Sequence, residues 1–253
     1  MIDTHCHLAD KRFDRDRVHV LDRARHAGVT HVVEVAWSPE LLPRAFALAA
    51  EHAGLYLCLG VHPSESARVP DGWIATLRDE ARRPRVVAIG ETGLDFYRDY
   101  APRADQERWF RAQLALADEL GLPVVIHQRS ALEETLAILE EARPSAGGVL
   151  HCFDDGPAAV ERAHALGFKL GLGGCLTYGH AALDEAVRMA PWELLVLETD
   201  APWLEPEPRS LRRNEPGLLR RVLPRLCELK GAEPAEADRI TTANARELFR
   251  LPA

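Results

Sequence analysis

Eight short apolar runs recur along this chain, and most of them end in a residue type that binds metal ions. The first run begins near Met1 and the eighth near Leu194, so a new run begins about every 28 residues. This spacing is close to the roughly 30 residues of a β-α-β unit. Side chains so far apart in sequence meet in one place if the strands run parallel and close into a barrel, where the carboxyl ends of all strands form one face. The runs are MIDTHCH, VTHVVEVA, LYLCLGVHP, VVAIGETG, PVVIHQR, GGVLHCF, FKLGLGG and LLVLETD.

The segments between these runs have the pattern of amphipathic helices. In the segment 105–120, apolar residues recur at spacings of four, three and three, which places them on one helical face. Gly121 then predicts the end of this helix, because glycine readily adopts the left-handed conformation of a helix C-terminus. Ser130 and Glu133 have the spacing of a capping box at the start of the next helix. Strands that alternate with helices predict an α/β protein with a parallel sheet.

Length and motif content favour a closed barrel over an open sheet. The 253 residues equal the typical size of one (β/α)₈ TIM barrel, so we expect a single domain over residues 1–253. The alternative is an open, doubly wound sheet, which usually carries a glycine-rich turn after its first strand. Here that position holds His5, Cys6 and His7 instead, and the open sheet ranks second.

Composition narrows the location and partners of the protein. The net charge of −8 argues against a wide, sequence-independent surface for duplex DNA, which needs a basic face. The apolar runs are much shorter than the roughly 18 residues that cross a bilayer, and MIDTHCH has no signal-peptide pattern. The sequence therefore predicts a cytoplasmic protein without a membrane partner or an obligate protein partner. Its five cysteines form no CxxC pair and are expected to be reduced.

The run ends supply a mixed set of imidazoles and carboxylates. On an extended strand alternate side chains share a face, so His5 and His7 point to the same side. His127 and His151 each follow a buried-strand pattern, and Glu91 and Asp200 stand at corresponding strand ends. Single histidines at such positions are often core residues, but a set from several strands indicates a metal site. The predicted metal ligands are His5, His7, Glu91, His127, His151 and Asp200.

Six such ligands exceed what one tetrahedral ion uses, so two divalent ions that share a carboxylate fit better. Glu91 is the natural bridge, with His5, His7 and Asp200 on one ion and His127 and His151 on the other. Imidazole with carboxylate suits Zn²⁺ or Mn²⁺ and, with more oxygen ligands, Mg²⁺. Two ions suit hydrolysis of a phosphoester or a carbonyl compound by metal-activated water. Glu91 and Asp200 are the predicted catalytic residues, and Asp200 can also accept the proton of the attacking water.

Four further residues are candidates for substrate binding. His62 either contacts substrate phosphate or anchors the loop beside Pro63. Arg129 has the geometry of a phosphate clamp, because guanidinium binds phosphate through two hydrogen bonds, or else it forms a surface ion pair. Asp95 either supports the site or caps a turn. Asn214 either contacts substrate or caps a helix together with the following proline.

In order and spacing, several segments resemble the motifs of the TatD family of metal-dependent deoxyribonucleases. The resemblance extends from Asp3 to Asn244 and implies a two-metal phosphodiesterase on an amidohydrolase-like TIM barrel. It further implies Mg²⁺-supported degradation of single-stranded DNA or DNA ends from the 3′ terminus, with all six predicted ligands at the family's ligand positions. The segments are DTHCHL, GVHP, IGETGLDFY, PVVIHQRSA, HCF, ETDAPWL and NEP.

Two segments depart from the family pattern. The family often reads EIGLDYY where this chain reads ETGLDFY, and HCFSG where this chain reads HCFDDG. The second departure adds acidic residues near the expected site. The alternative function is a different hydrolase on the same residues, such as a D-aminoacyl-tRNA deacylase or an amidohydrolase. Against an amidohydrolase with a bridging lysine, the chain has no lysine between Lys11 and Lys169. Purely structural ions are disfavoured, because structural sites are closed and rich in cysteine ligands.

Overall fold

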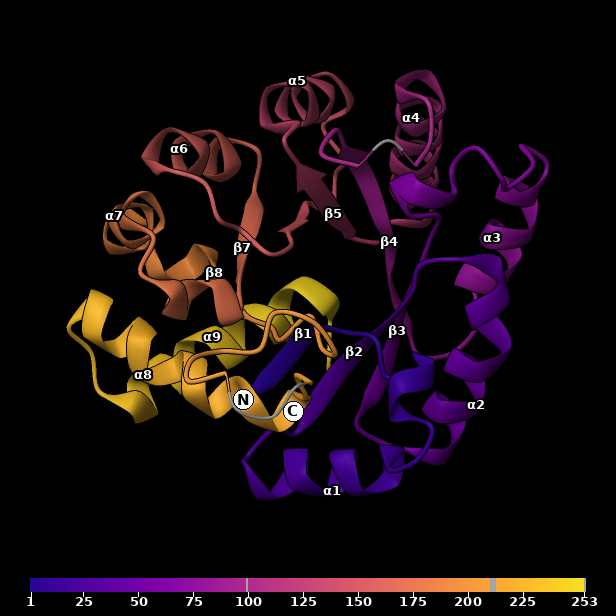
Figure 1. Ribbon diagram of the computed structural model, residues 1–253. Helices are drawn as coiled ribbons and strands as arrows, with labels where there is room; N and C mark the ends of the chain where they lie inside the picture. The colour runs from indigo at the N-terminus through magenta and orange to yellow at the C-terminus, as the bar shows by residue number, and fades with distance from the viewer. Residues whose placement is uncertain (99, 210–212, 253) are drawn as a thin grey trace.

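Eight parallel strands form one sheet in the order β1 to β8, with helices between successive strands (Figure 1). The architecture comes from a computed structural model that describes residues 1–98, 100–209 and 213–252. The predicted (β/α)₈ TIM barrel is thereby confirmed. The strands are β1 (Ile2–Cys6), β2 (His31–Ala36), β3 (Leu55–Leu59), β4 (Val86–Asp95), β5 (Val124–Arg129), β6 (Gly148–Leu150), β7 (Phe168–Leu172) and β8 (Leu195–Leu197).

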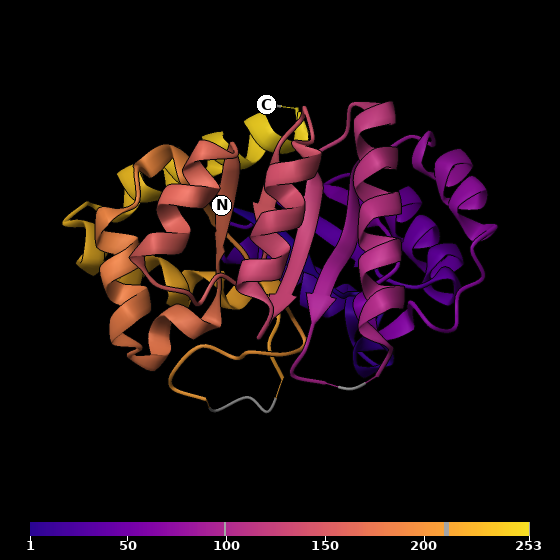
Figure 2. The ribbon, with the colours of Figure 1, turned by 90° about the horizontal axis from the view of Figure 1, so that it is seen from above.

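The helices surround the sheet on its outer side, as both ribbon views show (Figures 1 and 2). In the described part of the chain no helix has the length and apolar character that crossing a membrane requires. The helices are α1 (Arg17–His26), α2 (Leu42–Glu51), α3 (Trp73–Ala81), α4 (Arg103–Leu120), α5 (Leu132–Ala142), α6 (Pro157–Ala165), α7 (Ala181–Met189), α8 (Leu219–Lys230) and α9 (Pro234–Phe249).

Strand alternation divides the core into two apolar clusters. In β2, Val33 and Val35 belong to the cluster inside the barrel, whereas Val32 faces the helices. This is the period-two alternation that a sheet with both faces buried requires. Leu248 and Phe249 at the end of α9 join the inner cluster, so the last helix closes one end of the barrel. The opposite end, where the strands terminate, stays free for polar side chains.

The barrel closes between β1 and β8 through few contacts. Cys6 forms an isolated parallel bridge with Ala201, and the Thr4 hydroxyl donates a hydrogen bond to the carbonyl of Leu197 at 3.1 Å. The buried carboxylate of Asp3 accepts hydrogen bonds from the backbone N–H of Thr199 at 2.9 Å and from its hydroxyl at 2.6 Å. These buried hydrogen bonds therefore join the first strand to the segment after the last.

The helix-end predictions have mixed outcomes. Gly121 ends α4 with a left-handed φ of 62°, as predicted. The predicted capping box of Ser130 and Glu133 is wrong, because α5 begins one residue later, with Ala131 in the capping position. Ser130 instead has a left-handed φ of 54° and turns the chain out of β5. The five cysteines are free thiols, as expected.

Two buried glutamines of α4 fasten the loops that follow β3 and β4. The Gln113 side chain accepts a hydrogen bond from the backbone N–H of Val61 at 2.8 Å and donates to the Val61 carbonyl at 3.0 Å. It also donates to the hydroxyl of Thr92 at 2.7 Å. Gln106 likewise binds the backbone N–H and carbonyl of Asp95. Each side-chain amide takes the place of a backbone hydrogen-bond partner, so the buried N–H and carbonyl groups of an irregular segment remain paired.

We expect Gln113→Met to lower the free energy of unfolding by about 3 kcal/mol, because it leaves the buried N–H and carbonyl of Val61 unpaired while keeping the side-chain volume. Urea unfolding followed by circular dichroism measures the difference. Glu107→Met, on the exposed side of the same helix, is the matched control and should change stability by less than about 1 kcal/mol. Equal effects of the two substitutions would contradict the anchoring role of Gln113.

Candidate metal centre

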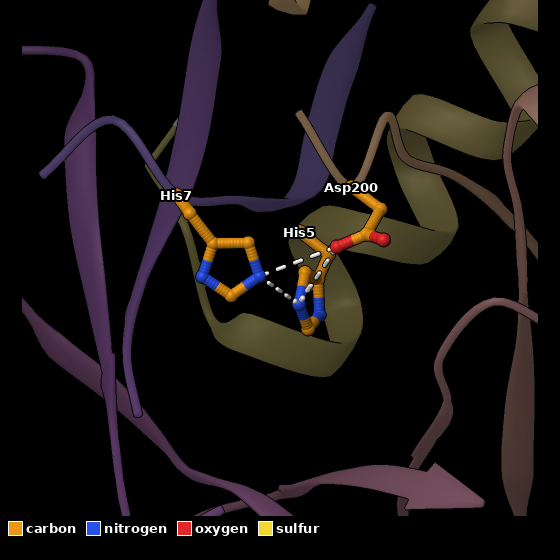
Figure 3. A group of neighbouring side chains, drawn as sticks. All are labelled: His5, His7 and Asp200. Carbon is orange, nitrogen blue, oxygen red and sulfur yellow. Dashed lines mark hydrogen bonds and ion pairs between the residues drawn. The ribbon is translucent and has the colours of Figure 1, made fainter. Parts of the chain in front are cut away.

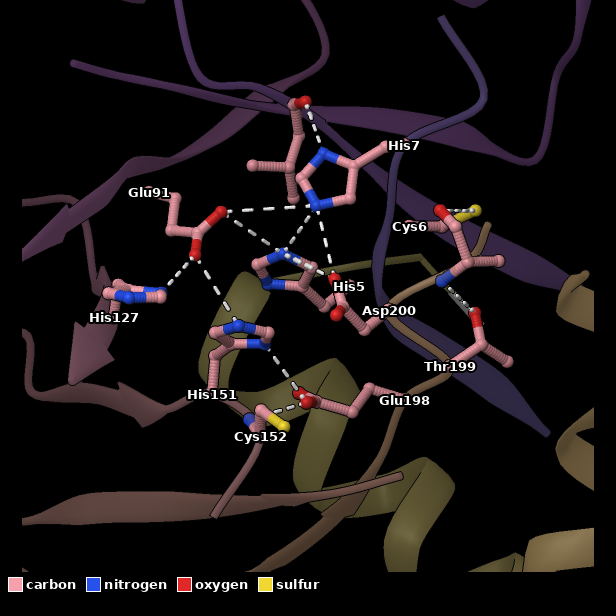
Figure 4. A network of polar contacts seen from close by, with 12 residues as sticks. His5, Cys6, His7, Glu91, His127, His151, Cys152, Glu198, Thr199 and Asp200 are labelled. Carbon is pink, nitrogen blue, oxygen red and sulfur yellow. Dashed lines mark hydrogen bonds and ion pairs between the residues drawn. The ribbon is translucent and has the colours of Figure 1, made fainter. Parts of the chain in front are cut away.

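Imidazoles and carboxylates from β1, β4 and β5, and from the segments directly after β1, β6 and β8, converge at the carboxyl ends of the strands (Figure 4). This is the face on which TIM barrels carry their active sites. The structure brings together all six residues that the sequence predicted as metal ligands. Among the described residues, three groups of side chains could hold a metal ion: His5 with His7 and Asp200, His62 with Glu91 and His127, and His5 with His151 and Glu198.

The first group consists of His5, His7 and Asp200 (Figure 3). The Nε2 atoms of the two histidines are 3.1 Å apart, and Nε2 of His7 lies 3.2 Å from Oδ1 of Asp200. Nε2 of His5 lies 3.8 Å from the same oxygen. The Nδ1 atom of His7 lies 3.2 Å from the Val35 carbonyl, a contact that fixes the ring with Nε2 toward the group.

The second group consists of His62, Glu91 and His127, and His151 lies beside it. Oε1 of Glu91 lies 2.8 Å from Nδ1 of His127, 3.4 Å from Nε2 of His151 and 3.7 Å from Nε2 of His62. The sequence did not predict His62 as part of a ligand group. Its Nδ1 accepts a hydrogen bond from the N–H of Ser64 at 3.1 Å, so His62 also anchors its loop.

Glu91 stands between the two groups. Its Oε1 faces His127 and His151, whereas its Oε2 lies 3.4 Å from Nε2 of His5 and 3.9 Å from Nε2 of His7. A carboxylate with one oxygen toward each of two sets of imidazole nitrogens has the geometry of a bridging ligand.

The two carboxylates are held in the ionised form that metal binding requires. Burial disfavours the charged form of Glu91, but the imidazoles around it, foremost that of His151, outweigh burial and keep its pKa well below the usual range. Burial also acts against ionised Asp200, whose pKa is nevertheless lowered, mainly by the hydrogen bond with His7.

The imidazoles differ in their preference for a proton. Burial lowers the pKa of His62 to about 3, with a further contribution from the neighbouring His127. Burial would also lower the pKa of His151, but Glu198 and Glu91 overcome this effect and raise it to about 10. Among these side chains alone, the protonated imidazole of His151 therefore balances the negative charge of Glu91 and Glu198.

The donor set fits divalent cations. The Nε2 atoms of His5 and His7 lie 3.1 Å apart and within 4 Å of Oδ1 of Asp200, so a single cation could take all three atoms as ligands. Nδ1 of His5 and Oε2 of Glu198 are buried without a hydrogen-bond partner among the described residues, so the centre retains unused donor capacity. Neutral imidazole with carboxylate is a common ligand set for divalent metal ions in enzymes.

The remaining predicted residues occupy different positions. Arg129 is exposed on the wall of a cavity beside the metal centre. Asp95 is buried, with Oδ2 at 3.2 Å from Nε2 of His127, and it caps the following turn through Oδ1. Asn214 is fully buried; its amide donates hydrogen bonds to the carbonyls of Thr199 and Leu204. Asn214 is not a helix cap, since Glu215 occupies that position for the short helix that follows.

Sequence reasoning missed Glu198. Its buried Oε1 lies 3.0 Å from Nδ1 of His151 and accepts a hydrogen bond of 2.5 Å from the N–H of Cys152. The carboxylate presses against Gly171 of β7, where a Cβ atom would lie 2.1 Å from Oε2. The available signals were the spacing of two between Glu198 and Asp200 at the end of β8 and the glycine-rich GLGG segment beside them. The absence of a side chain at Gly171 thus lets the Glu198 carboxylate lie directly against the backbone of β7.

A cavity of about 830 Å³ adjoins the metal centre. Its wall includes the centre's own His127, His151 and Asp200, and continues over the segments after β5, β6 and β8. Trp203 stands at its edge with the indole 4.9 Å from the ring of His7. A volume of this size accommodates a ligand as large as a nucleotide.

Comparison with known proteins gives one consistent result. Residues 2–250 match the model of the family described as TatD related DNase. The "3'-5' ssDNA/RNA exonuclease TatD" of Erwinia amylovora is 40% identical over 99% of this chain and 100% of its own. The "uncharacterized metal-dependent hydrolase YabD" of Bacillus subtilis is 36% identical over 99% of both chains. The crystal structure of YJJV, a TatD homologue from Escherichia coli, superimposes with a TM-score of 0.95 at 34% identity and covers 100% of this chain and 98% of that one.

We expect Glu91→Ala to bind at least one divalent ion fewer per chain than the unmodified protein, because the substitution removes the carboxylate between the two groups. Metal content is measured by plasma mass spectrometry after loading and gel filtration. Glu185→Ala, on the exposed face of α7, is the control and should bind as many ions as the unmodified protein. Two ions per chain in both variants would show that Glu91 is not a required bridge.

We expect Glu198→Gln to weaken metal binding about 10–100-fold, because a carboxylate that orients a ligand histidine raises the basicity of that ligand. Competition with a chromophoric chelator measures the affinity. Glu193→Gln, an exposed substitution of the same kind, should leave it unchanged. An unchanged affinity in Glu198→Gln would restrict Glu198 to packing against Gly171 and holding Cys152.

Proposed function

Because this chain belongs to the family of TatD-related DNases, we propose that it is a metal-dependent nuclease that removes nucleotides from the 3′ end of single-stranded nucleic acid. It is a hydrolase that acts on phosphodiester bonds, as the resemblance of its motifs to this family implied. The observation that carries the 3′-exonuclease proposal is the position of Glu91 between two groups of imidazoles beside a nucleotide-sized cavity.

We assign the ligands to two ions. His5, His7, Glu91 and Asp200 would hold one, and Glu91, His127 and His151 would hold the other. His62, which the sequence suggested for substrate contact or loop anchoring, is a further candidate ligand of the second ion. Mg²⁺ and Mn²⁺ are the proposed functional ions, with Zn²⁺ as the third candidate. When bound, such ions supply Lewis acidity toward phosphoryl oxygens and increase the acidity of water.

The chain's own residues prepare the site for this reaction. Asp200 is ionised at neutral pH and exposes part of its carboxylate, so it can accept a proton from an attacking water. Its backbone has a left-handed φ of 56°, and the N–H of Asp200 donates to the His5 carbonyl at 2.9 Å. The Asn214 side chain donates a hydrogen bond to the carbonyl of Thr199, the residue directly before Asp200. Asn214 is therefore proposed as a positioning residue that keeps Asp200 directed at the centre, in place of a substrate contact.

Arg129 and Asp95, which lie on the β5 side of the centre, have different proposed roles. Arg129 is free to bind a phosphate group, because its guanidinium forms no ion pair with a carboxylate among the described residues. Asp95 is too deeply buried to meet substrate and instead orients His127 through the contact with Nε2. We propose Arg129 as the phosphate ligand and Asp95 as a positioning residue.

A gel time course on single-stranded DNA labelled at its 5′ end tests the proposal. With Mg²⁺, Mn²⁺ or Zn²⁺ we expect a ladder that shortens one nucleotide at a time and is abolished by EDTA. Asp200→Asn should slow it about 10²–10⁴-fold, the usual contribution of a positioned proton acceptor. Exposed Glu185→Gln is the control. DNA that stays intact with all three metals would remove the nuclease assignment, and D-aminoacyl-tRNA, amides and lactones would then be the substrates to test.

A further inference from the structure

Two tyrosines on the loop after β4 leave most of their side chains in solvent. Tyr97 is 59% exposed and Tyr100 is 62% exposed. The loop follows the carboxyl end of a strand, so it lies on the same face as the metal centre. The guanidinium of Arg129 lies 3.9 Å from the ring centroid of Tyr97, and that of Arg98 lies 5.3 Å from it. Below, Tyr97, Arg98, Tyr100 and Arg129 are called the tyrosine platform.

Buried polar groups hold the backbone of Tyr97 and Arg98 and the two ends of this loop. Oδ1 of Asp95 accepts hydrogen bonds from the N–H of Tyr97 at 3.0 Å and of Arg98 at 2.9 Å. The buried amide of Gln106 donates to the carbonyls of Asp95 at 3.1 Å and of Ala101 at 2.9 Å, so it fastens both ends of the loop. Exposed aromatic rings on an anchored backbone lose little conformational entropy when a ligand binds.

The platform and the metal centre share residues. The Asp95 carboxylate that holds Tyr97 and Arg98 through Oδ1 lies 3.2 Å from Nε2 of His127 through Oδ2. Arg129 lies two residues after His127 on β5, lines the cavity with it, and accepts a hydrogen bond of 2.9 Å at its carbonyl from the N–H of Phe96. A polymer bound at the centre would therefore pass the platform as it leaves.

Charge is divided between the two sides of this face. The cavity wall carries the acidic side chains Glu133, Glu134, Asp154 and Asp155, and Arg129 lines it on the platform side. On the platform side, Arg98 and Arg129 are exposed, and neither forms an ion pair with a carboxylate of residues 1–98, 100–209 or 213–252. In a chain with a net charge of −8, exposed guanidinium groups that have no carboxylate partner in the described part of the chain, beside exposed rings, mark a surface for anionic, aromatic ligands.

We infer that the tyrosine platform binds the nucleotides on the 5′ side of the scissile phosphate of a single strand, by stacking of bases on Tyr97 and Tyr100 and by contact of phosphates with Arg98 and Arg129. The 3′-terminal nucleoside, which carries no phosphate beyond the scissile one, occupies the acidic cavity. The strand that remains attached carries a phosphate at every step and follows the cationic side. This assignment rests on the proposed function, and the experiment separates the two.

The experiment measures binding without cleavage. Metal-free protein in EDTA is titrated with a fluorescein-labelled 15-nucleotide single strand, and anisotropy gives the affinity. A second strand carries 2-aminopurine at the second and third positions from its 3′ end, where stacking quenches fluorescence. Tyr97→Ala and Tyr100→Ala should each weaken binding about tenfold and reduce the quenching. Tyr97→Phe, which keeps the ring, should retain both.

Met189→Ala is the matched control. Met189 is 46% exposed at the end of α7, on the face opposite the strand ends, and its substitution should leave affinity and quenching unchanged. With metal present, we expect the unmodified protein to have a higher kcat/KM for a 15-mer than for a dinucleotide. In Tyr97→Ala the two values of kcat/KM should become nearly equal.

The outcomes distinguish the platform from the proposed function. Wild-type affinity and quenching in both alanine variants, with normal degradation of the 15-mer, would overturn the platform and leave the nuclease assignment intact. Tyrosine-dependent binding without degradation under any metal would retain the platform as a nucleic-acid surface and remove the nuclease. An equal loss of binding in Tyr97→Ala and Tyr97→Phe would also overturn stacking, because the ring would then not be the binding element.

Discussion

The closure of the barrel between its first and last strands is the constraint on which the metal centre depends. β1 supplies His5, and Asp200 follows β8, so neither can reach the other until the sheet has closed. Asp3 makes this junction through its hydrogen bonds with Thr199, and the same carboxylate accepts a hydrogen bond from the N–H of His5 at 3.3 Å. Burial, opposed by the hydrogen bonds from Thr199, raises the pKa of Asp3 to about 8. One buried acidic group thus joins the two ends of the sheet and orients a ligand strand.

A second buried carboxylate shapes the exit from β1. Glu34 of β2 accepts hydrogen bonds from the N–H groups of Leu8 at 2.5 Å and Ala9 at 2.9 Å, which turns the chain directly after His7. Together with Asp95 and Glu198, it shows a common arrangement. At the ends of β1, β5 and β6, an acidic side chain outside the proposed ligand set contacts the ligand histidine or the backbone directly after it. Such supporting contacts are what give a metal site its geometry.

The sequence was sufficient for the architecture and for the residues that gather at the centre. Regular spacing of apolar runs predicted the strands, because a strand buried on both faces reads as a continuous apolar segment. His5, His7, Glu91 and Asp200 stood out since a polar residue after such a segment is expensive unless it has a partner. Glu198 escaped notice because it lies one residue before Thr199 and reads as the ordinary polar end of a strand. Its role depends on Gly171 of a neighbouring strand, and that contact is tertiary. The Ser130 capping box failed for a related reason, since the exit path from β5 decides where the helix begins.

The seam between β1 and β8 also has a consequence for the time at which activity can arise. During synthesis, the segment with His5 and His7 leaves the ribosome almost two hundred residues before Asp200 does. The emerging chain contains imidazoles but cannot enclose the centre until the eighth strand has taken its place beside the first. A nascent or truncated chain would therefore lack the complete centre, and the site forms only after the whole sheet has been synthesised.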